Sequence, residues 1–156
     1  MDFLHAKYLK IVAAGGDLSA APEKKFTKEV ASLKVERKLA ESFVSETSQP
    51  IRRAEVGTDF NLKGVLEQAD LDDLVFLIGG VHTTGTFTKT QTVAALPKYD
   101  IEVGVYRPSD GAIVPWTLTN VNFVQAVEFK FEHAKWSYMP VEAMGTSESS
   151  LTIDNT

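Results

Sequence analysis

The sequence predicts a mainly β protein, an antiparallel β-sandwich or open barrel flanked by one short α-helix over about residues 70–78. Two observations predict this class. Most of the chain alternates apolar and polar residues with a period of two, which is typical of strands that bury one face. One segment follows a helical period instead. With 156 residues, 44% of them hydrophobic, the chain has the size and composition of one globular domain.

Strands are predicted where the alternation is clearest. A run around Leu33, Val35 and Leu39 fits a strand whose apolar face is interrupted by Arg37. Three further runs also alternate, and Pro140 suggests an edge or an end after the last of them. Their apolar positions are Phe60, Leu62, Gly64 and Leu66, then Tyr99, Ile101, Val103 and Val105, then Val121, Phe123, Val127, Phe129 and Phe131.

A tight turn is predicted at residues 108–111, which read Pro-Ser-Asp-Gly. Proline presets the first corner of such a turn, and glycine supplies the positive φ at its exit. We therefore expect strands over 99–107 and 112–119 to pair antiparallel. Thr119 and Asn120 are expected to bend the second strand into a strand over 121–132.

The helix is predicted from apolar residues spaced i, i+3, i+4 and i+7. Asp70 is expected to cap its first turn, and Asp72 and Asp73 suit the positive end of the helix dipole. Gly79 should end it. A helix of two to three turns must dock its apolar stripe on a sheet to be stable. The predicted stripe consists of Leu71, Leu74, Val75 and Ile78.

Composition and charge exclude several functional classes. The absence of cysteine excludes disulfides, cysteine-ligated metals and thiol catalysis. A net charge of −5 gives no basic footprint for nucleic acid. Residues 1–63 carry 11 Lys and Arg against 9 Asp and Glu, while residues 64–156 carry 5 against 12. This asymmetry is either chance variation on a solvated surface or a pair of complementary faces that attract neighbouring copies.

No local pattern predicts catalysis, a metal site or a cofactor. His5, His82 and His133 are isolated from one another, and helix capping accounts for the three neighbouring aspartates. We therefore expect no enzyme and no cofactor. No stretch reaches the ~18 apolar residues of a membrane span, so we expect a protein made in a cytoplasm without a membrane partner.

A row of threonines spans Thr84 to Thr92 at every second position. The alternation predicts one strand that bears the threonines on a single face. That face is either solvated or an intersubunit contact.

Over roughly residues 5–145, the order of elements resembles the major tail tube proteins of long-tailed bacteriophages. The type VI secretion tube shares that architecture. The resemblance rests on an irregular excursion, a long strand, a short acidic-capped helix ending in Gly-Gly, and two late strands. These segments are 40–51, 60–68, the helix ending at 77–80, 113–123 and 127–136.

The resemblance implies a structural virion protein with one domain over residues 1–145 and a polar C-terminal tail over 146–156. Proteins of that family form hexameric rings, and the stacked rings are the conduit for genomic DNA. The implied partners are further copies of the chain and other tail proteins (terminator, baseplate or tip, tape measure). Double-stranded DNA passes without specific binding, and the implied location is the virion tail.

Two sites follow from the resemblance. A long loop over about residues 41–53 resembles the family's contact with the next ring. The family's lumens tend to be acidic, and carboxylates that repel phosphates let DNA pass without adhering. For the apolar loop residues the alternative is packing on their own domain, and for the carboxylates it is a solvated strand face. The loop residues are Phe43, Val44, Ile51, Arg52 and Arg53, and the lumen residues are Glu55, Asp59, Glu67, Asp100 and Glu102.

Other functions remain open at this point. One is another tail or neck ring protein, such as a terminator or completion protein, and another is the tube of a contractile injection system. A third is a monomeric β-sandwich that binds carbohydrate or an apolar ligand. In that protein Trp116, Trp136 and Tyr138 would form a stacking platform, whereas they otherwise serve as core aromatics.

Overall fold

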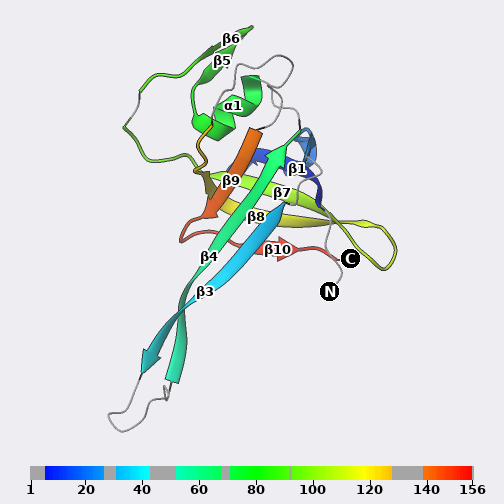
Figure 1. Ribbon diagram of the computed structural model, residues 1–156, viewed down its shortest axis with the longest axis vertical. Coiled ribbons are helices and arrows are strands. Elements are labelled where there is room, and N and C mark those ends of the chain that lie inside the picture. The colour runs from blue at the N-terminus through cyan, green and yellow to red at the C-terminus, as the bar shows by residue number, and fades with distance from the viewer. Residues whose placement is uncertain are drawn as a thin grey trace.

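The computed structural model describes residues 6–26, 31–42, 52–67, 71–91, 93–127 and 139–155. Within these ranges the protein is mainly antiparallel β with one short α-helix, which confirms the predicted fold class (Figure 1). The elements are β1 (Ala6–Ala13), the 3-10 helix η1 (Leu18–Ala20), β2 (Lys24–Lys25), β3 (Ser32–Ser42), β4 (Arg52–Leu66), α1 (Leu71–Ile78), β5 (Val81–Thr83), β6 (Thr86–Thr88), β7 (Tyr99–Tyr106), β8 (Ile113–Phe123), β9 (Met139–Gly145) and β10 (Leu151–Ile153).

The main sheet has the strand order β2-β1-β7-β8-β9-β4-β3, and all its neighbours are antiparallel. β8 is its central strand. One edge of β8 pairs with β7, while the other edge pairs first with β10, at Trp116–Leu118, and then with β9, at Val121–Phe123. Asn120 lies where the partner changes and has a φ of 53°, which agrees with the predicted bend.

β2, at one end of this sheet, meets β4, the strand next to the other end. Phe26, next to β2, forms an antiparallel bridge with Leu66 at the end of β4, and the Glu67 N–H donates to the Lys25 carbonyl at 2.9 Å. Gly64 makes room for this contact, because a Cβ there would lie 2.7 Å from the Phe26 ring. The sheet therefore rolls into a barrel that closes beside the C-terminal end of β4.

The core confirms the predicted alternation. Every predicted apolar position of β7 is at most 9% exposed, and Leu62 and Leu66 of β4 are buried. Burial of this kind contributes roughly 25 cal/mol per Å² of apolar surface. The largest fully buried side chains are Leu9, Leu66, Ile101, Val121 and Val141.

The helix is confirmed, but its predicted stripe is wrong in part. Leu74 and Leu77 are buried, whereas Leu71 is 38% exposed. The stripe is displaced toward Leu77 because the helix packs at the rim of the barrel, where Phe76 meets Tyr99 edge to face at 5.5 Å. Gly79 follows the helix with a φ of 73°, as its predicted end requires. Asp70, the predicted cap, lies outside the described residues.

The predicted turn at 108–111 joins β7 to β8. Gly111 has a φ of 71°, and the Arg107 N–H donates to the Ala112 carbonyl at 2.7 Å. The Arg107 guanidinium and the Ala112 N–H both bind the Asp110 carboxylate, which lowers its pKa to about 2. The sequence therefore predicted this hairpin and its turn correctly.

Three strand predictions require correction. β8 ends at Phe123, and 124–127 are not a strand, so the strand predicted over 121–132 is too long at least there; 128–138 lie outside the described residues. The polar tail predicted over 146–156 contains β10, which pairs with β8 and satisfies an otherwise open edge. The threonine row is not one strand, because the chain reverses at Thr84 and Gly85 between β5 and β6. Thr92 lies outside the described part.

The predicted loop over 41–53 is partly strand, since β3 extends to Ser42 and β4 begins at Arg52. We call the outer half of this hairpin, residues 37–42 and 52–58, the arm. Figure 1 shows the arm projecting from the barrel, away from α1. Among the described residues, no helix has the length and apolar character needed to span a bilayer.

Candidate assembly surfaces

The apolar side of β3 and β4 that packs against the core continues beyond the barrel, where its residues are exposed to solvent. Leu33 and Val35 of β3 face Leu62 and Phe60 of β4 on the side that packs against the core. Leu39 lies on the same face of β3, because successive strand residues alternate sides. Val35 and Leu39 are each 49% exposed. Among the described residues, no segment outside β3 and β4 covers this face of the arm.

A bulge in the arm adds a third exposed apolar residue. The pairing register shifts between Lys38 and Leu39, which leaves Val56 as the extra residue of β4. Val56 is 65% exposed. A two-stranded hairpin is marginally stable in water without a third strand or a packed face. Val35, Leu39 and Val56 are therefore the exposed apolar side chains of this hairpin.

Ion pairs neutralise most of the arm's charges. Arg53 meets Glu41 at 3.2 Å, Lys38 meets Asp59 at 3.2 Å, and Arg37 lies 3.8 Å from Glu55. These side chains are exposed, so each pair contributes only about 0–1 kcal/mol. They hold the two strands in register and leave Arg52 without an ion pair to any described residue.

Two of the predicted lumen carboxylates are bound within their own barrel. Asp100 accepts the N–H groups of Gly15 and Asn120, each at 3.0 Å. Glu102 accepts the Tyr8 hydroxyl at 2.9 Å and lies 3.8 Å from Lys10. Burial, and then the bond to Glu102, raises the pKa of Tyr8 to about 12. Both carboxylates thus stabilise the turn and strand contacts around β7.

The other three predicted lumen residues lie elsewhere. Glu55 and Asp59 are on β4 within or beside the arm, and Glu67 follows the opposite end of β4. A single subunit therefore does not gather the five carboxylates on one surface. Of the predicted loop residues, Arg52 and Arg53 begin β4, while Phe43, Val44 and Ile51 lie outside the described residues.

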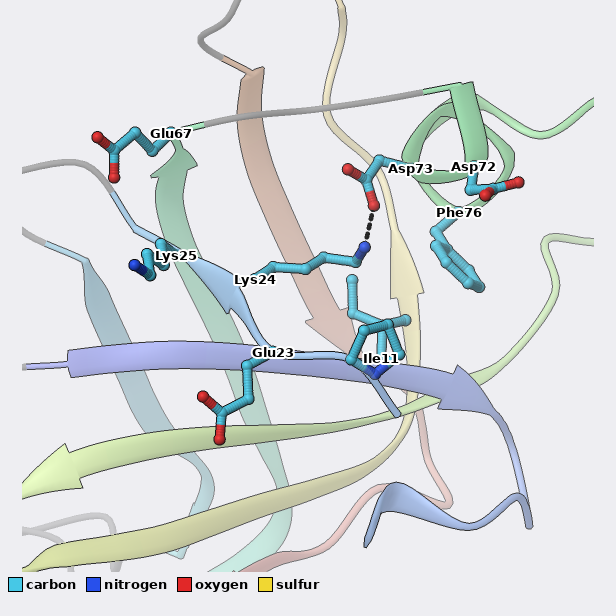
Figure 2. Close-up of a pocket in the computed structure, with 9 residues that line it drawn as sticks. Ile11, Glu23, Lys24, Lys25, Glu67, Asp72, Asp73 and Phe76 are labelled. Atoms are coloured by element: carbon cyan, nitrogen blue, oxygen red, sulfur yellow. Dashed lines mark ion pairs between the residues drawn. The ribbon is translucent and has the colours of Figure 1, made fainter. Parts of the chain in front are cut away.

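A groove of about 520 Å³ opens at the end of β4 that lies away from the arm (Figure 2). Its volume is in the range of ligand pockets in proteins. Across its floor, Lys24 of β2 forms an ion pair with Asp73 of α1, and the Lys24 ammonium lies 6.0 Å from the centre of the Phe76 ring. The groove is lined by Ile11, Pro22, Glu23, Lys24, Lys25, Glu67, Asp72, Asp73 and Phe76.

The ion pair of the groove corrects the sequence interpretation of Asp73. Helix capping and the helix dipole were expected to account for it, but its side chain is only 4% exposed and that of Lys24 only 12%. Asp72 contacts His82 Nδ1 at 2.5 Å instead of facing the dipole alone. No sequence spacing connects Lys24 with Asp73, because the barrel's closure is what brings β2 beside α1.

The remaining features do not indicate a chemical site. Within the ranges that the structure describes, no three His, Asp or Glu side chains form a group that could hold a metal ion. Gln125 binds the Leu77 carbonyl and the Glu142 N–H, and so fastens the end of α1 to β9. The exposure of Val35, Leu39 and Val56 was not predicted from the sequence, since alternation alone predicts burial for the first two.

The chain matches no protein-family model and no curated protein. Among solved structures it is similar to the tube-terminating cap of the anti-feeding prophage, at 13% identity and a TM-score of 0.48, over 95% of this chain and 88% of that one. It is also similar to the sheath/tube terminator of the extracellular contractile injection system PVC, at 11% identity and a TM-score of 0.44, over 94% of this chain and 92% of that one. A third similar structure is the tail of an empty gene transfer agent particle, at 14% identity and a TM-score of 0.39, over 92% of this chain and 95% of that one.

Proposed function

We propose that this chain is a structural subunit of a phage-like tail, which assembles into stacked hexameric rings that form the tail tube for DNA ejection. The observation that carries this proposal is the arm. Val35, Leu39 and Val56 are exposed on a hairpin that projects from a complete barrel. Arg37 separates Val35 from Leu39 on this face of β3, and we assign these exposed apolar side chains to a contact with another subunit.

The resemblance of the sequence to tail tube proteins supports the same function. It implied a β-sandwich with a flanking helix, in which a long strand leads into a short helix that ends in glycine. In the structure β4 precedes α1, and Gly79 follows the helix. Partners of the assembled chain are then its own copies and the other tail proteins, and its location is the virion tail.

The inter-ring contact is assigned in this proposal to the arm and its tip. Arg52 and Arg53 stand at the base of the tip, whose apolar residues are Phe43, Val44 and Ile51. The core-facing side of the arm then packs on the neighbouring copy. Closing the sheet edges between copies also removes unpaired strands that would otherwise invite aggregation.

The lumen of the tube is acidic in this proposal. Glu55, Asp59 and Glu67 are exposed, and together with Asp100 and Glu102 they are the residues assigned to it. Carboxylates repel the phosphates of passing DNA, so DNA moves without specific binding.

The proposal is tested with Val35→Asp/Leu39→Asp. These changes place two charges on one face of β3, one just before the arm and one within it. The wild-type chain is expected to reach masses far above six copies in light scattering as its concentration rises. The double variant should form no assembly larger than a single ring of six, with a wild-type circular dichroism spectrum, because both residues are outside the core. A matched control exchanges the exposed pair on the other face, Lys34→Glu/Glu36→Lys, and should assemble normally.

Two outcomes contradict the tube. A wild-type ring of six that never grows would assign the chain to a terminator or completion protein. A monomer at every concentration that binds a polysaccharide would assign it to the carbohydrate-binding class.

A further inference from the structure

The arm and the groove lie at opposite ends of one strand. β4 begins at Arg52 in the arm and ends at Leu66, beside Glu67 in the groove. A strand of 15 residues spans roughly 45–50 Å at about 3.4 Å per residue. Figure 1 shows the arm at one end of the molecule and α1, which forms one wall of the groove, at the other. A copy placed end to end therefore brings an arm to a groove.

The two surfaces have complementary charge. Glu23 and Glu67 are exposed at the groove, and neither forms an ion pair with the described residues. The Lys24–Asp73 pair on the floor is neutral overall, which leaves Lys25 as the exposed basic residue there. In Figure 2 the Glu23 and Glu67 side chains point away from this pair. The groove thus presents net negative charge to an approaching segment.

The arm end supplies the matching groups. Arg52 and Arg53 are exposed, and Arg52 has no ion-pair partner among the described residues. The intervening sequence contains the apolar residues Phe43, Val44 and Ile51. Ile11 and Phe76 give the groove an apolar wall, and its 520 Å³ is room for two or three side chains of that size.

We propose that the groove is the receptor for the arm end, residues 43–53, of a second copy of this chain. Arg52 and Arg53 then lie against Glu67 and Glu23, and the apolar residues of the tip cover Ile11 and Phe76. In this arrangement Glu67 belongs to the contact between rings and no longer to the lumen. The inference rests on the proposed function, because it names the surface that receives the inter-ring contact. It also adds a direction to the assembly.

That direction follows from the type of contact. The arm and the groove are different surfaces, so the contact is heterologous and leaves one free arm and one free groove at the ends of any stack. Such a contact repeats without closing and gives a polar, open-ended assembly. A molecule that binds in the free groove at one end of the stack would prevent the addition of further copies at that end.

Charge reversal on each side tests the contact. Arg52→Glu/Arg53→Glu and Glu23→Arg/Glu67→Arg change exposed side chains and are expected to keep the wild-type melting temperature. Each should raise the concentration for half-assembly more than about tenfold, because like charges then face each other. The chain carrying all four changes restores opposite charges and should assemble near the wild-type concentration. Glu36→Arg/Glu148→Arg changes the net charge as Glu23→Arg/Glu67→Arg does, at positions outside the groove and the arm end, and should assemble normally.

A second readout separates this inference from the proposed function. A synthetic peptide of residues 41–53 is titrated into the full chain at a concentration where it is monomeric, and amide chemical shifts are recorded. We expect shifts only at residues of β2, the end of β4 and α1, and none in Glu23→Arg/Glu67→Arg. This result would support binding of the arm end in the groove even if no tube forms. Two results would contradict the groove as receptor without contradicting the tail function. One is a wild-type chain that assembles while the peptide causes no such shifts. The other is a four-change chain whose concentration for half-assembly is as high as that of the two double variants.

Discussion

Replacing Asp73 with asparagine is expected to lower the free energy of unfolding by about 3–5 kcal/mol, because it leaves the Lys24 ammonium buried without its counter-charge. The two side chains are 12% and 4% exposed, so solvent does not compensate for the loss. The pair also joins β2 to α1 across the groove. Urea denaturation followed by tryptophan fluorescence measures the change.

The neighbouring aspartate provides the control for this experiment. Asp72 contacts His82 from a side chain that is 70% exposed, so Asp72→Asn should cost less than about 1 kcal/mol. The double variant Lys24→Met/Asp73→Leu removes both charges and should recover most of the loss. An Asp73→Asn variant as stable as the Asp72→Asn variant would show that the pair does not hold α1 on the barrel.

Replacing Gly104 with alanine is expected to destabilise the protein by about 1–3 kcal/mol through overpacking. Gly104 faces Tyr8 across β7 and β1, and an added methyl group would overlap the Tyr8 ring. Gly57→Ala is the matched control, since its Cβ would meet only the flexible Lys38 side chain, at 3.9 Å. Thermal melting of the two variants should therefore differ clearly.

The same substitution should change one tyrosine titration. The pKa of Tyr8 is raised to about 12 from its ordinary value of 10, so the neutral phenol is favoured in the folded state. Its contribution to stability is complete below pH 10 and is lost as the pH rises toward 12. In Gly104→Ala the ring moves away from Glu102, and ultraviolet titration should show this phenol ionising nearer 10. A Tyr8 titration identical to wild type would contradict the packing described here.

The sequence predicted those parts of the fold in which local pattern and tertiary packing agree. The β7–β8 hairpin combines four buried alternating positions with a turn that proline and glycine specify. α1 combines a helical apolar period with a terminal glycine. In both cases one segment of chain contains the whole signal.

The missed elements lack such a signal. β10 is three residues long, and it exists because the free edge of β8 accepts it. β9 alternates buried Met139, Val141 and Ala143 with other residues, but Pro140 at its start suggested an end instead of a beginning. Barrel closure at Phe26 and the Lys24–Asp73 pair depend on contacts between distant segments.

The candidate site shows the same limit. Periodicity identified Val35 and Leu39 as one face of a strand, but it does not say whether that face is covered by the same chain or by another. The predicted loop residues Arg52 and Arg53 proved to be the start of a strand, because pairing with Glu41 and Ser42 extends the hairpin outward. The groove lies between β2, β4 and α1, so it required the three-dimensional fold.

Negative-stain electron microscopy of the concentrated wild-type protein shows directly whether the chain forms a tube. We expect hollow tubes built of stacked six-fold rings, which are absent in Val35→Asp/Leu39→Asp. Particles without a central channel, or a chain that remains a single barrel at every concentration, would contradict it.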